Sequence, residues 1–216
     1  MPRPYLTATD HAFASGPVFM RPGSLNAAVA ATGNKADGEL LCNIFESFNR
    51  QAQCGARVRL GLGARLVNDN RSRTVQIGDD CAIRGIIRCE AGASVTVGNL
   101  VYVGDNVIIS ARQSVEIADS TLLAHGVQIF DNDSHPTDAA EREAHFKAIL
   151  DAGSLKPFHV AAAPVKLGRR CWLGFNSAVM KGVTIGDESI VAAGSIVVRD
   201  VPPRVVVAGN PARVVK

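Results

Sequence analysis

The chain has few aromatic residues and none of the features that mark membrane or secreted proteins. Aromatic residues make up 5% of its 216 residues, with one Trp and two Tyr. No apolar run approaches the ~18 residues of a membrane-spanning helix. The first ten residues, MPRPYLTATD, lack the basic and then apolar form of a secretory signal. These absences predict a cytoplasmic protein without a transmembrane segment.

Cysteine and charge exclude two further classes of protein. The five cysteines are an odd number without CxxC spacing, so no disulfide framework is expected. The formal net charge is only +3, and no basic run is interleaved with aromatic residues, which argues against a nucleic-acid partner. With 47% hydrophobic and 20% charged residues, the chain is instead typical of one folded domain with a sizeable core.

A period of six residues is the main positive signal. In the first half, inward aliphatic or small residues are expected at Ile77, Ile83, Cys89, Val97, Val103, Ile109, Ile117, Leu123 and Ile129. The second half continues at Leu167, Leu173, Val179, Ile185, Val191 and Val197. Neither a helix nor an alternating strand has this period. It predicts an all-β fold, a triangular parallel β-helix whose coils stack at roughly 4.8 Å.

Small residues are expected at the corners of this prism. Glycines suited to tight corners recur at Gly78, Gly98, Gly104, Gly168, Gly174 and Gly186. Small inward residues are expected at Cys171, Ser177, Val183, Ser189 and Ser195. The first coils carry about two residues more than a plain triangle, which predicts a recurring bulge near Ala93–Ser94 and Gln113–Ser114. Cys81, Cys89 and Cys171 are interpreted as buried.

The repeat divides the chain into two domains. Residues 1–57 form an N-terminal extension with a helix from about Gly38 to Gln53, which is expected to cap the prism. Residues 58–216 form the β-helix domain. A loop at 131–164 interrupts this domain, and an excursion of that length is more often functional than idle.

The C-terminal coils and two motifs resemble a known family. The segment from Pro164 to Lys216, together with HPTDAAER from His135 and the terminal GNPARVVK, is similar to hexapeptide-repeat acetyltransferases. The resemblance is closest to the maltose, galactoside and polysaccharide O-acetyltransferase group. It implies a left-handed β-helix, a homotrimer with sites between subunits, acetyl-CoA as donor, a sugar or glycan acceptor, and no metal.

The resemblance implies that His135 is the catalytic base. Acetyl transfer to a hydroxyl requires removal of the hydroxyl proton, and an imidazole is suited to this near neutral pH. A thioester carries its own leaving group, so direct transfer needs no enzyme nucleophile. Asp133 either orients the ring or grips the acceptor, or is only a turn residue.

Other site residues are implied by the same resemblance. Expected cofactor-binding residues are Gly174, Phe175, Ala193, Val198, Arg199 and Arg213, the arginines lying near the phosphates. Expected acceptor-binding residues are Asp105, Asn106, Asp133, Arg142 and Trp172. Asp105 and Asn106 are candidates because Gly104 stands where the family usually carries an acceptor-binding Asn.

Several alternatives remain open. A xenobiotic acetyltransferase, or another hexapeptide acyltransferase, would share the prism and the base. A zinc β-helix protein of the carbonic anhydrase type needs three convergent histidines, whereas His125 and His135 are ten residues apart without a close His pair. A non-catalytic scaffold would not need the HPTDAAER and GNPAR motifs.

Overall fold

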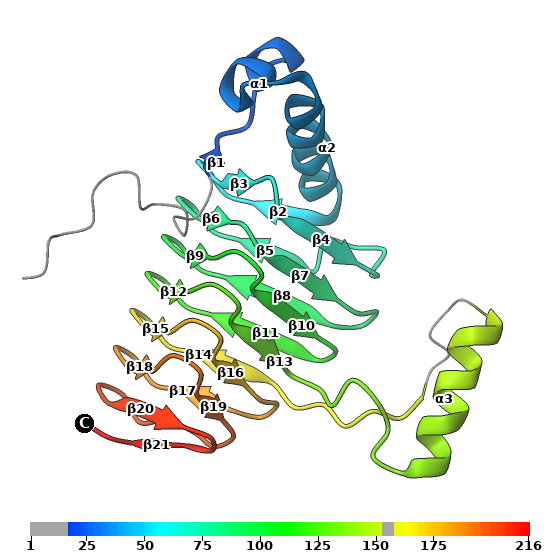
Figure 1. Ribbon diagram of the computed structural model, residues 1–216, viewed down its shortest axis with the longest axis vertical. Coiled ribbons are helices and arrows are strands. Elements are labelled where there is room, and N and C mark those ends of the chain that lie inside the picture. The colour runs from blue at the N-terminus through cyan, green and yellow to red at the C-terminus, as the bar shows by residue number, and fades with distance from the viewer. Residues whose placement is uncertain (1–16, 153–157) are drawn as a thin grey trace, which may run out of the picture.

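The computed structural model describes residues 17–152 and 158–216, and the first sixteen residues of the predicted extension lie outside this range. Its body is a prism of three parallel sheets, here called A, B and C (Figure 1). Each coil passes from sheet B to sheet A, then to sheet C, and returns to sheet B. The predicted parallel β-helix is therefore confirmed, and the arrangement is consistent with left-handed winding.

The strands are short, and each sheet stacks parallel strands from successive coils, with one antiparallel strand added at each end of sheet A. Sheet A contains β1 (Val18–Phe19), β3 (Arg59–Gly61), β6 (Ala82–Ile83), β9 (Tyr102–Val103), β12 (Leu122–Leu123), β15 (Trp172–Leu173), β18 (Ile190–Val191), β20 (Val206–Gly209) and β21 (Ala212–Val214). Sheet B contains β2 (Ala52–Cys54), β5 (Val75–Ile77), β8 (Ser94–Val97), β11 (Ser114–Ile117), β14 (Val165–Leu167) and β17 (Thr184–Ile185). Sheet C contains β4 (Arg65–Asn68), β7 (Ile86–Cys89), β10 (Ile108–Ala111), β13 (Gln128–Phe130), β16 (Ala178–Val179) and β19 (Ile196–Val197).

The core is the stack of inward residues that the six-residue period predicts. In sheet A the register aligns Ile83, Val103, Leu123, Leu173, Val191 and Val207, all buried. The small inward residues of the second half, and Cys81, Cys89 and Cys171, are buried as predicted. The six-residue period predicts that Cys89 and Ile109 are equivalent positions in successive coils, and this is wrong: Cys89 pairs with Ala111, whereas Ile109 pairs with Ile87. The connection from β6 to β7 has two residues, Arg84 and Gly85, whereas the connection from β9 to β10 in the next coil has four.

Two N-terminal helices cover one end of the prism, at the top of Figure 1. The predicted helix is α2 (Lys35–Gln51), which buries Leu41, Ile44, Phe45 and Phe48 against the first coil. A shorter helix, α1 (Leu25–Thr32), was not predicted; it is capped by Ser24 and ends at Gly33 in the left-handed region, with φ of 85°. Strand β2 already pairs with β5, so the prism begins before Val58.

The excursion is not only a loop. It contains a third helix, α3 (Ala139–Ala152), which stands away from the prism on two extended segments (Figure 1). The sequence predicts a loop here, because the apolar residues of this segment show little helical periodicity. Among the described residues, no helix has the length and apolar character needed to cross a membrane.

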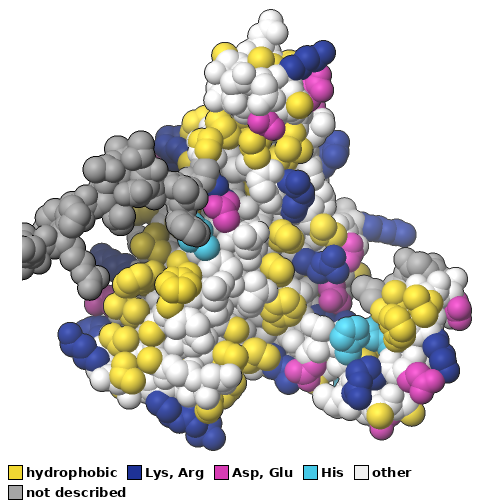
Figure 2. Space-filling model, in the orientation of Figure 1, with side chains coloured by type: hydrophobic (Ala, Val, Ile, Leu, Met, Phe, Trp, Pro, Cys, Tyr) yellow, Lys and Arg dark blue, Asp and Glu magenta, His cyan; other side chains and the backbone are white. Residues whose placement is uncertain are grey.

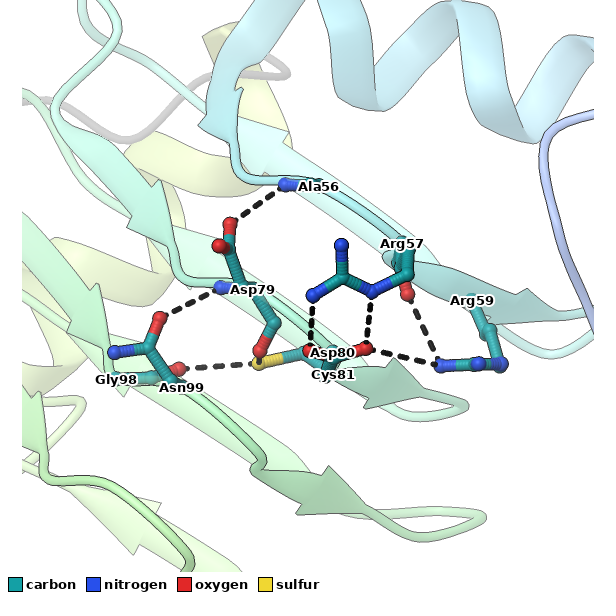
Figure 3. Close-up of polar contacts among 8 residues, drawn as sticks. All are labelled: Ala56, Arg57, Arg59, Asp79, Asp80, Cys81, Gly98 and Asn99. Atoms are coloured by element: carbon teal, nitrogen blue, oxygen red, sulfur yellow. Dashed lines mark hydrogen bonds and ion pairs between the residues drawn. The ribbon is translucent and has the colours of Figure 1, made fainter.

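Side-chain oxygens join successive coils at the corner between sheets B and A. Oδ1 of Asp79 accepts a hydrogen bond from the backbone N of Ala56 at 2.7 Å, and Oδ1 of Asn99 accepts one from the N of Asp79 at 2.8 Å (Figure 3). Asp119 and Asp187 repeat the contact in later coils, at 2.7 and 2.8 Å. We call Asp79, Asn99, Asp119 and Asp187 the Asx ladder.

Beside the ladder, Arg57 donates from Nε and Nη2 to the carboxylate of Asp80, at 2.7 and 2.6 Å (Figure 3). These hydrogen bonds hold the pKa of Asp80 below its ordinary value. On the inner side, Sγ of Cys81 donates to the carbonyl of Gly98 at 3.0 Å.

The recurring glycines are needed for close packing between coils. The six predicted corner glycines do not have positive φ angles. A Cβ added at Gly78 would lie 2.6 Å from Oδ1 of Asn99 and 2.7 Å from the carbonyl carbon of Gly98. The left-handed positions belong to other residues, such as Asp80 and Leu100, with φ of 57° and 56°. The glycine positions follow the prediction, but the physical reason is the spacing of the coils.

Candidate active site

The segment that carries His135 is anchored to the preceding coil by Asp131. This carboxylate is fully buried where the chain leaves β13. Its oxygens accept hydrogen bonds from the backbone N–H groups of Arg112 and Gln113, at 2.8 and 2.7 Å, and one from the Asn132 amide at 2.9 Å. The excursion therefore begins from a fixed point of the prism.

A tight turn then presents His135 at the rim of sheet C. Oδ1 of Asn132 accepts from the N of Ser134 at 2.9 Å, and the carbonyl of Asp133 accepts from the N of His135 at 2.7 Å. Ser134 takes the left-handed conformation, with φ of 62°. The turn leaves His135 exposed to solvent.

The rest of the HPTDAAER motif fixes the start of α3. Oδ1 of Asp138 accepts from the N of Glu141 at 2.9 Å, which is the geometry of a helix N-cap. Nη1 of Arg142 donates to the carbonyls of Pro136 and Thr137, at 3.1 and 2.9 Å. In this structure Arg142 braces the turn after His135, and its predicted contact with an acceptor stays a prediction.

A second histidine meets the ring of His135. His145 lies on α3 and is 3% exposed, and its Nδ1 is 3.3 Å from Nδ1 of His135. The two ring centroids are 5.2 Å apart. Phe158 packs on the other side of His145, with ring centroids 4.7 Å apart. The excursion thus folds back so that α3 supports the exposed histidine.

Asp133 contacts a cation rather than the ring of His135. Its carboxylate pairs with Nζ of Lys181, which follows β16 in the next coil. The ion pair ties the excursion to the second half of the prism. The Asp133 carboxylate therefore contacts Lys181, and the ring of His135 contacts His145 instead.

Arg112 holds the returning part of the excursion. Its guanidinium donates from Nη1 to Glu90 and from Nη2 to the carbonyl of Phe158, both at 2.9 Å. The excursion is therefore bound to the prism near both ends, at Asp131 and at Phe158.

Five other predicted site residues lie at the corner between sheets A and C. The corner positions Asp105, His125, Phe175 and Ala193 stack in one column, one in each coil. Each is followed by a residue in the left-handed region; these residues are Asn106, Gly126, Asn176 and Gly194. The N–H groups of Gly126, Asn176 and Gly194 donate to the carbonyls of Asp105, His125 and Phe175 in the preceding coils. A Cβ at Gly174 would lie 2.9 Å from Cα of Ala193. The structure therefore brings together Asp105, Asn106, Gly174, Phe175 and Ala193 along one edge.

Asp105 is already engaged by a buried arginine. Arg84 is 6% exposed and donates from Nε and Nη2 to the two carboxylate oxygens of Asp105, each at 2.9 Å. A further donor of Arg84 reaches the carbonyl of Pro17 at 3.0 Å. The side chain of Asn106 is exposed beside this pair.

Exposed apolar residues surround the same corner on the outer face of sheet A. Trp172 pairs in register with Leu122 and Ile190, and it is half exposed. Phe175 is 59% exposed. Figure 2 shows apolar side chains gathered over this part of the molecule, at lower left. We call Leu122, Trp172, Phe175 and Ile190 the apolar stripe.

The remaining cofactor candidates lie elsewhere. Val198 and Arg199 follow β19 at the corner between sheets C and B, the same corner that His135 and Lys181 occupy in earlier coils. Arg213 lies on β21, at the edge of sheet A. A strand of sheet C, roughly 10 Å long, separates the corner of His135 from the corner of Phe175.

Sequence reasoning missed two contacts at this site, the His135–His145 contact and the Asp133–Lys181 ion pair. His145 follows His135 by ten residues, and only a helix that folds back brings the two rings together. No motif in the sequence signals the Lys181 contact, because it joins different coils. Among the residues that the structure describes, no three His, Cys, Asp or Glu side chains form a group that could hold a metal ion.

Comparisons with known proteins agree with the fold. Residues 164–199 match the model of the hexapeptide repeat of succinyl-transferase. An N-acyltransferase from Bacillus cereus, solved with dTDP and coenzyme A, superposes with a TM-score of 0.61 over 79% of this chain and 88% of its own, at 17% identity. At that identity, the likeness supports the fold alone.

Two relatives are similar in sequence. Galactoside O-acetyltransferase of Escherichia coli is 31% identical over 65% of this chain, and the match spans 62% of the relative, which is less than two thirds of its length. Nodulation protein L of Rhizobium meliloti is 35% identical over 64% of this chain and 68% of its own length. Because Nodulation protein L is 35% identical and matched over 68% of its length, and because the hexapeptide model matches residues 164–199, the chain belongs to the hexapeptide-repeat acetyltransferase family.

Proposed function

We propose that this protein transfers an acetyl group from acetyl-CoA to a hydroxyl of a sugar or polysaccharide precursor. Membership of the family supports acetyl transfer, and the relative named galactoside O-acetyltransferase supports a sugar hydroxyl as acceptor. The observation that carries the proposal is the exposed ring of His135, held at the rim of the prism by a buried anchor and by α3.

The proposed reaction is a direct transfer in which His135 acts as general base. Nε2 of His135 accepts the proton of the acceptor hydroxyl while the hydroxyl oxygen attacks the thioester carbonyl. The new C–O bond forms and the C–S bond breaks. The leaving thiolate then takes the proton back from the imidazolium, which releases coenzyme A and restores the neutral ring.

We also propose that the site is completed by a neighbouring copy in a homotrimer. One chain places His135 and Asp133 at one corner of sheet C and places Phe175 and Ala193 at the other. A closed threefold arrangement would bring the first corner of one copy against the second corner of the next. The apolar stripe suits such an interface, because it exposes large apolar side chains on one face of the chain. A stable, active monomer near 22.7 kDa in light scattering would contradict this arrangement.

The cofactor residues in this proposal are those implied by the family resemblance. Backbone groups at Gly174, Phe175 and Ala193 would bind the pantetheine arm, and Arg199 and Arg213 would lie near the phosphates. Val198 would also contact the cofactor. Trp172, Asp105, Asn106 and Arg142 remain candidates for the acceptor side. Arg84 holds Asp105 in a bidentate pair, so the exposed Asn106 is the freer of those two neighbours.

The test is a transfer assay with acetyl-CoA and a panel of acceptors that includes galactosides, maltose, oligosaccharides and antibiotic alcohols. His135→Ala is expected to bind acetyl-CoA but to lose about 10²–10⁴-fold in kcat with the best acceptor. The matched control is His159→Ala, because His159 is an exposed histidine of the same excursion. Near-parental turnover in His135→Ala would overturn the assignment of the base. Transfer to an antibiotic alcohol and to no sugar would overturn the acceptor class.

A further inference from the structure

The buried histidine on α3 calls for a specific explanation. His145 is the buried residue of α3, whereas the other side chains that the structure describes on this helix are exposed or half-buried. Burying an imidazole without a hydrogen bond costs free energy, so its ring nitrogens need partners. The partner in this structure is Nδ1 of His135, at 3.3 Å. The helix therefore supports the exposed histidine through one polar contact.

A hydrogen bond between two Nδ1 atoms requires one proton between them, and that proton fixes both tautomers. If His145 donated the proton, Nε2 of His135 would carry the other proton of its ring and could not accept one. If His135 donates, its Nε2 has a free lone pair. Only the second arrangement leaves His135 able to act as a base on the side away from α3.

We propose that His145 is a positioning residue that accepts a hydrogen bond from Nδ1–H of His135 and so keeps Nε2 of His135 unprotonated. The inference rests on the proposed role of His135 as general base. The packing of Phe158 against His145 holds the accepting ring in place, with centroids 4.7 Å apart. In the Ser-His-Asp triad, a carboxylate accepts the hydrogen bond from Nδ1–H and so fixes the tautomer of the catalytic histidine. Here the nearby carboxylate of Asp133 is paired with Lys181, and a neutral imidazole takes its place.

The partner also stabilises the ring during turnover. When Nε2 of His135 takes the acceptor proton, the imidazolium still donates from Nδ1 to His145. The lone pair of the buried His145 then stabilises the positive charge of the imidazolium through this hydrogen bond. No proton needs to pass to His145 during the reaction.

The first experiment compares His145→Phe with His145→Asn. His145→Phe keeps an aromatic ring beside Phe158 but removes the acceptor, and it is expected to lose about 10–100-fold in kcat with little change in KM for acetyl-CoA. His145→Asn places a carbonyl oxygen near the position of Nδ1, and it is expected to recover most of that loss. In a His135→Ala background, His145→Phe is expected to cause little additional loss, because the two residues act as a unit.

The second experiment observes the tautomer directly in the unmodified protein. Nitrogen-15 shifts of labelled histidine are expected to show Nδ1–H and a bare Nε2 for His135, and His145→Phe is expected to shift His135 toward a mixture of tautomers. A protonated Nε2 in the resting protein would overturn the proposal. Restoration of activity by Zn²⁺ after removal of metals would also overturn it, because the two Nδ1 atoms would then share a metal ion.

The outcomes separate this inference from the proposed function. If His135→Ala is inactive while His145→Phe keeps parental kcat, the base remains and the positioning role fails. If His135→Ala is itself active, the proposed function fails first. If His145→Phe does not fold, the His145→Asn variant and the tautomer measurement still decide the question.

Discussion

Two corners of the prism use the same acidic and amide residues for different purposes. At the corner between sheets B and A, the Asx ladder repeats one backbone contact in successive coils. At the corner between sheets C and B, Asp131 and Asp133 occur once, where the repeat is interrupted. Asp131 is buried and anchors the excursion, and Asp133 reaches a cation of another coil. Both the ladder and Asp131 accept hydrogen bonds from backbone N–H groups, but the ladder repeats along the prism, whereas Asp131 and Asp133 fix the one excursion that carries His135.

Removal of the Asp131 carboxylate is the strongest test of this difference between the two corners. In Asp131→Ala, the backbone N–H groups of Arg112 and Gln113 lose their acceptor in a buried place, at a cost of about 1–3 kcal/mol for each orphaned donor. We expect a large fall in the midpoint of thermal or urea unfolding. We also expect a fall in kcat, because the His135 turn loses its fixed starting point.

Asp131→Asn serves as the control for this variant. The amide keeps one oxygen acceptor but presents donors to the other N–H group, so we expect an intermediate loss of stability. Parental stability in Asp131→Ala would mean that the aperiodic corner does not depend on its buried carboxylate.

The spacing of the coils at the ladder can be tested at Gly78. A side chain there would approach Asn99 and the Gly98 backbone, so Gly78→Ala is expected to destabilise the fold by about 1–3 kcal/mol. That corresponds to roughly 2–4 °C in Tm for each kcal/mol in a chain of this size. Gly23→Ala is the matched control, since a Cβ at Gly23 would meet no atom within 4 Å. Equal Tm values for the two variants would show that coil spacing does not require Gly78.

The sequence predicts the periodic parts well because each coil meets the same physical requirements. Inward positions such as Val103 and Leu123 must be apolar, since they stack in a closed core. The helix α2 is also predictable, because one of its faces must cover the open end of the prism. Even here, the six-residue period wrongly makes Cys89 equivalent to Ile109. The two coils are equally long but divide their connecting residues differently between two corners, and the period does not show this.

The aperiodic site is only partly predictable. HPTDAAER identifies His135 as a candidate and places Arg142 nearby, but the motif does not show that Arg142 braces the backbone. The helix α3 has little apolar periodicity because it covers no part of the core. The partner of His135 therefore depends on a tertiary contact that no local pattern encodes.

One rung of the ladder can be removed with a smaller effect. Asn99→Ala deletes the acceptor for the N of Asp79 at an exposed corner, where water can replace it. We expect a loss of about 0.5–1.5 kcal/mol in unfolding free energy, with kcat unchanged, because this corner lies away from His135. A kcat that falls in parallel with that of Asp131→Ala would contradict the division between a structural corner and a functional one.

The smallest expected effect is in the reactivity of the thiols along the inner side of the prism. Cys81, Cys89 and Cys171 are buried, and burial raises the pKa of each thiol, so little thiolate is available near neutral pH. Partial desolvation of the thiol also raises the pKa of Cys54, although the residue as a whole is exposed. In the native protein we therefore expect a thiol reagent to modify Cys54 and the half-buried Cys42 first, and all five cysteines only after unfolding.

The rate at which a thiol reagent modifies Cys81 also reports whether neighbouring coils separate at the Asx ladder. Because Sγ of Cys81 donates to the carbonyl of Gly98, the Gly78→Ala variant is expected to expose Cys81 sooner, whereas Gly23→Ala is not. Rapid modification of Cys81 in the unaltered protein would mean that the corner opens without any substitution, and that the ladder holds the coils less firmly than its hydrogen bonds imply.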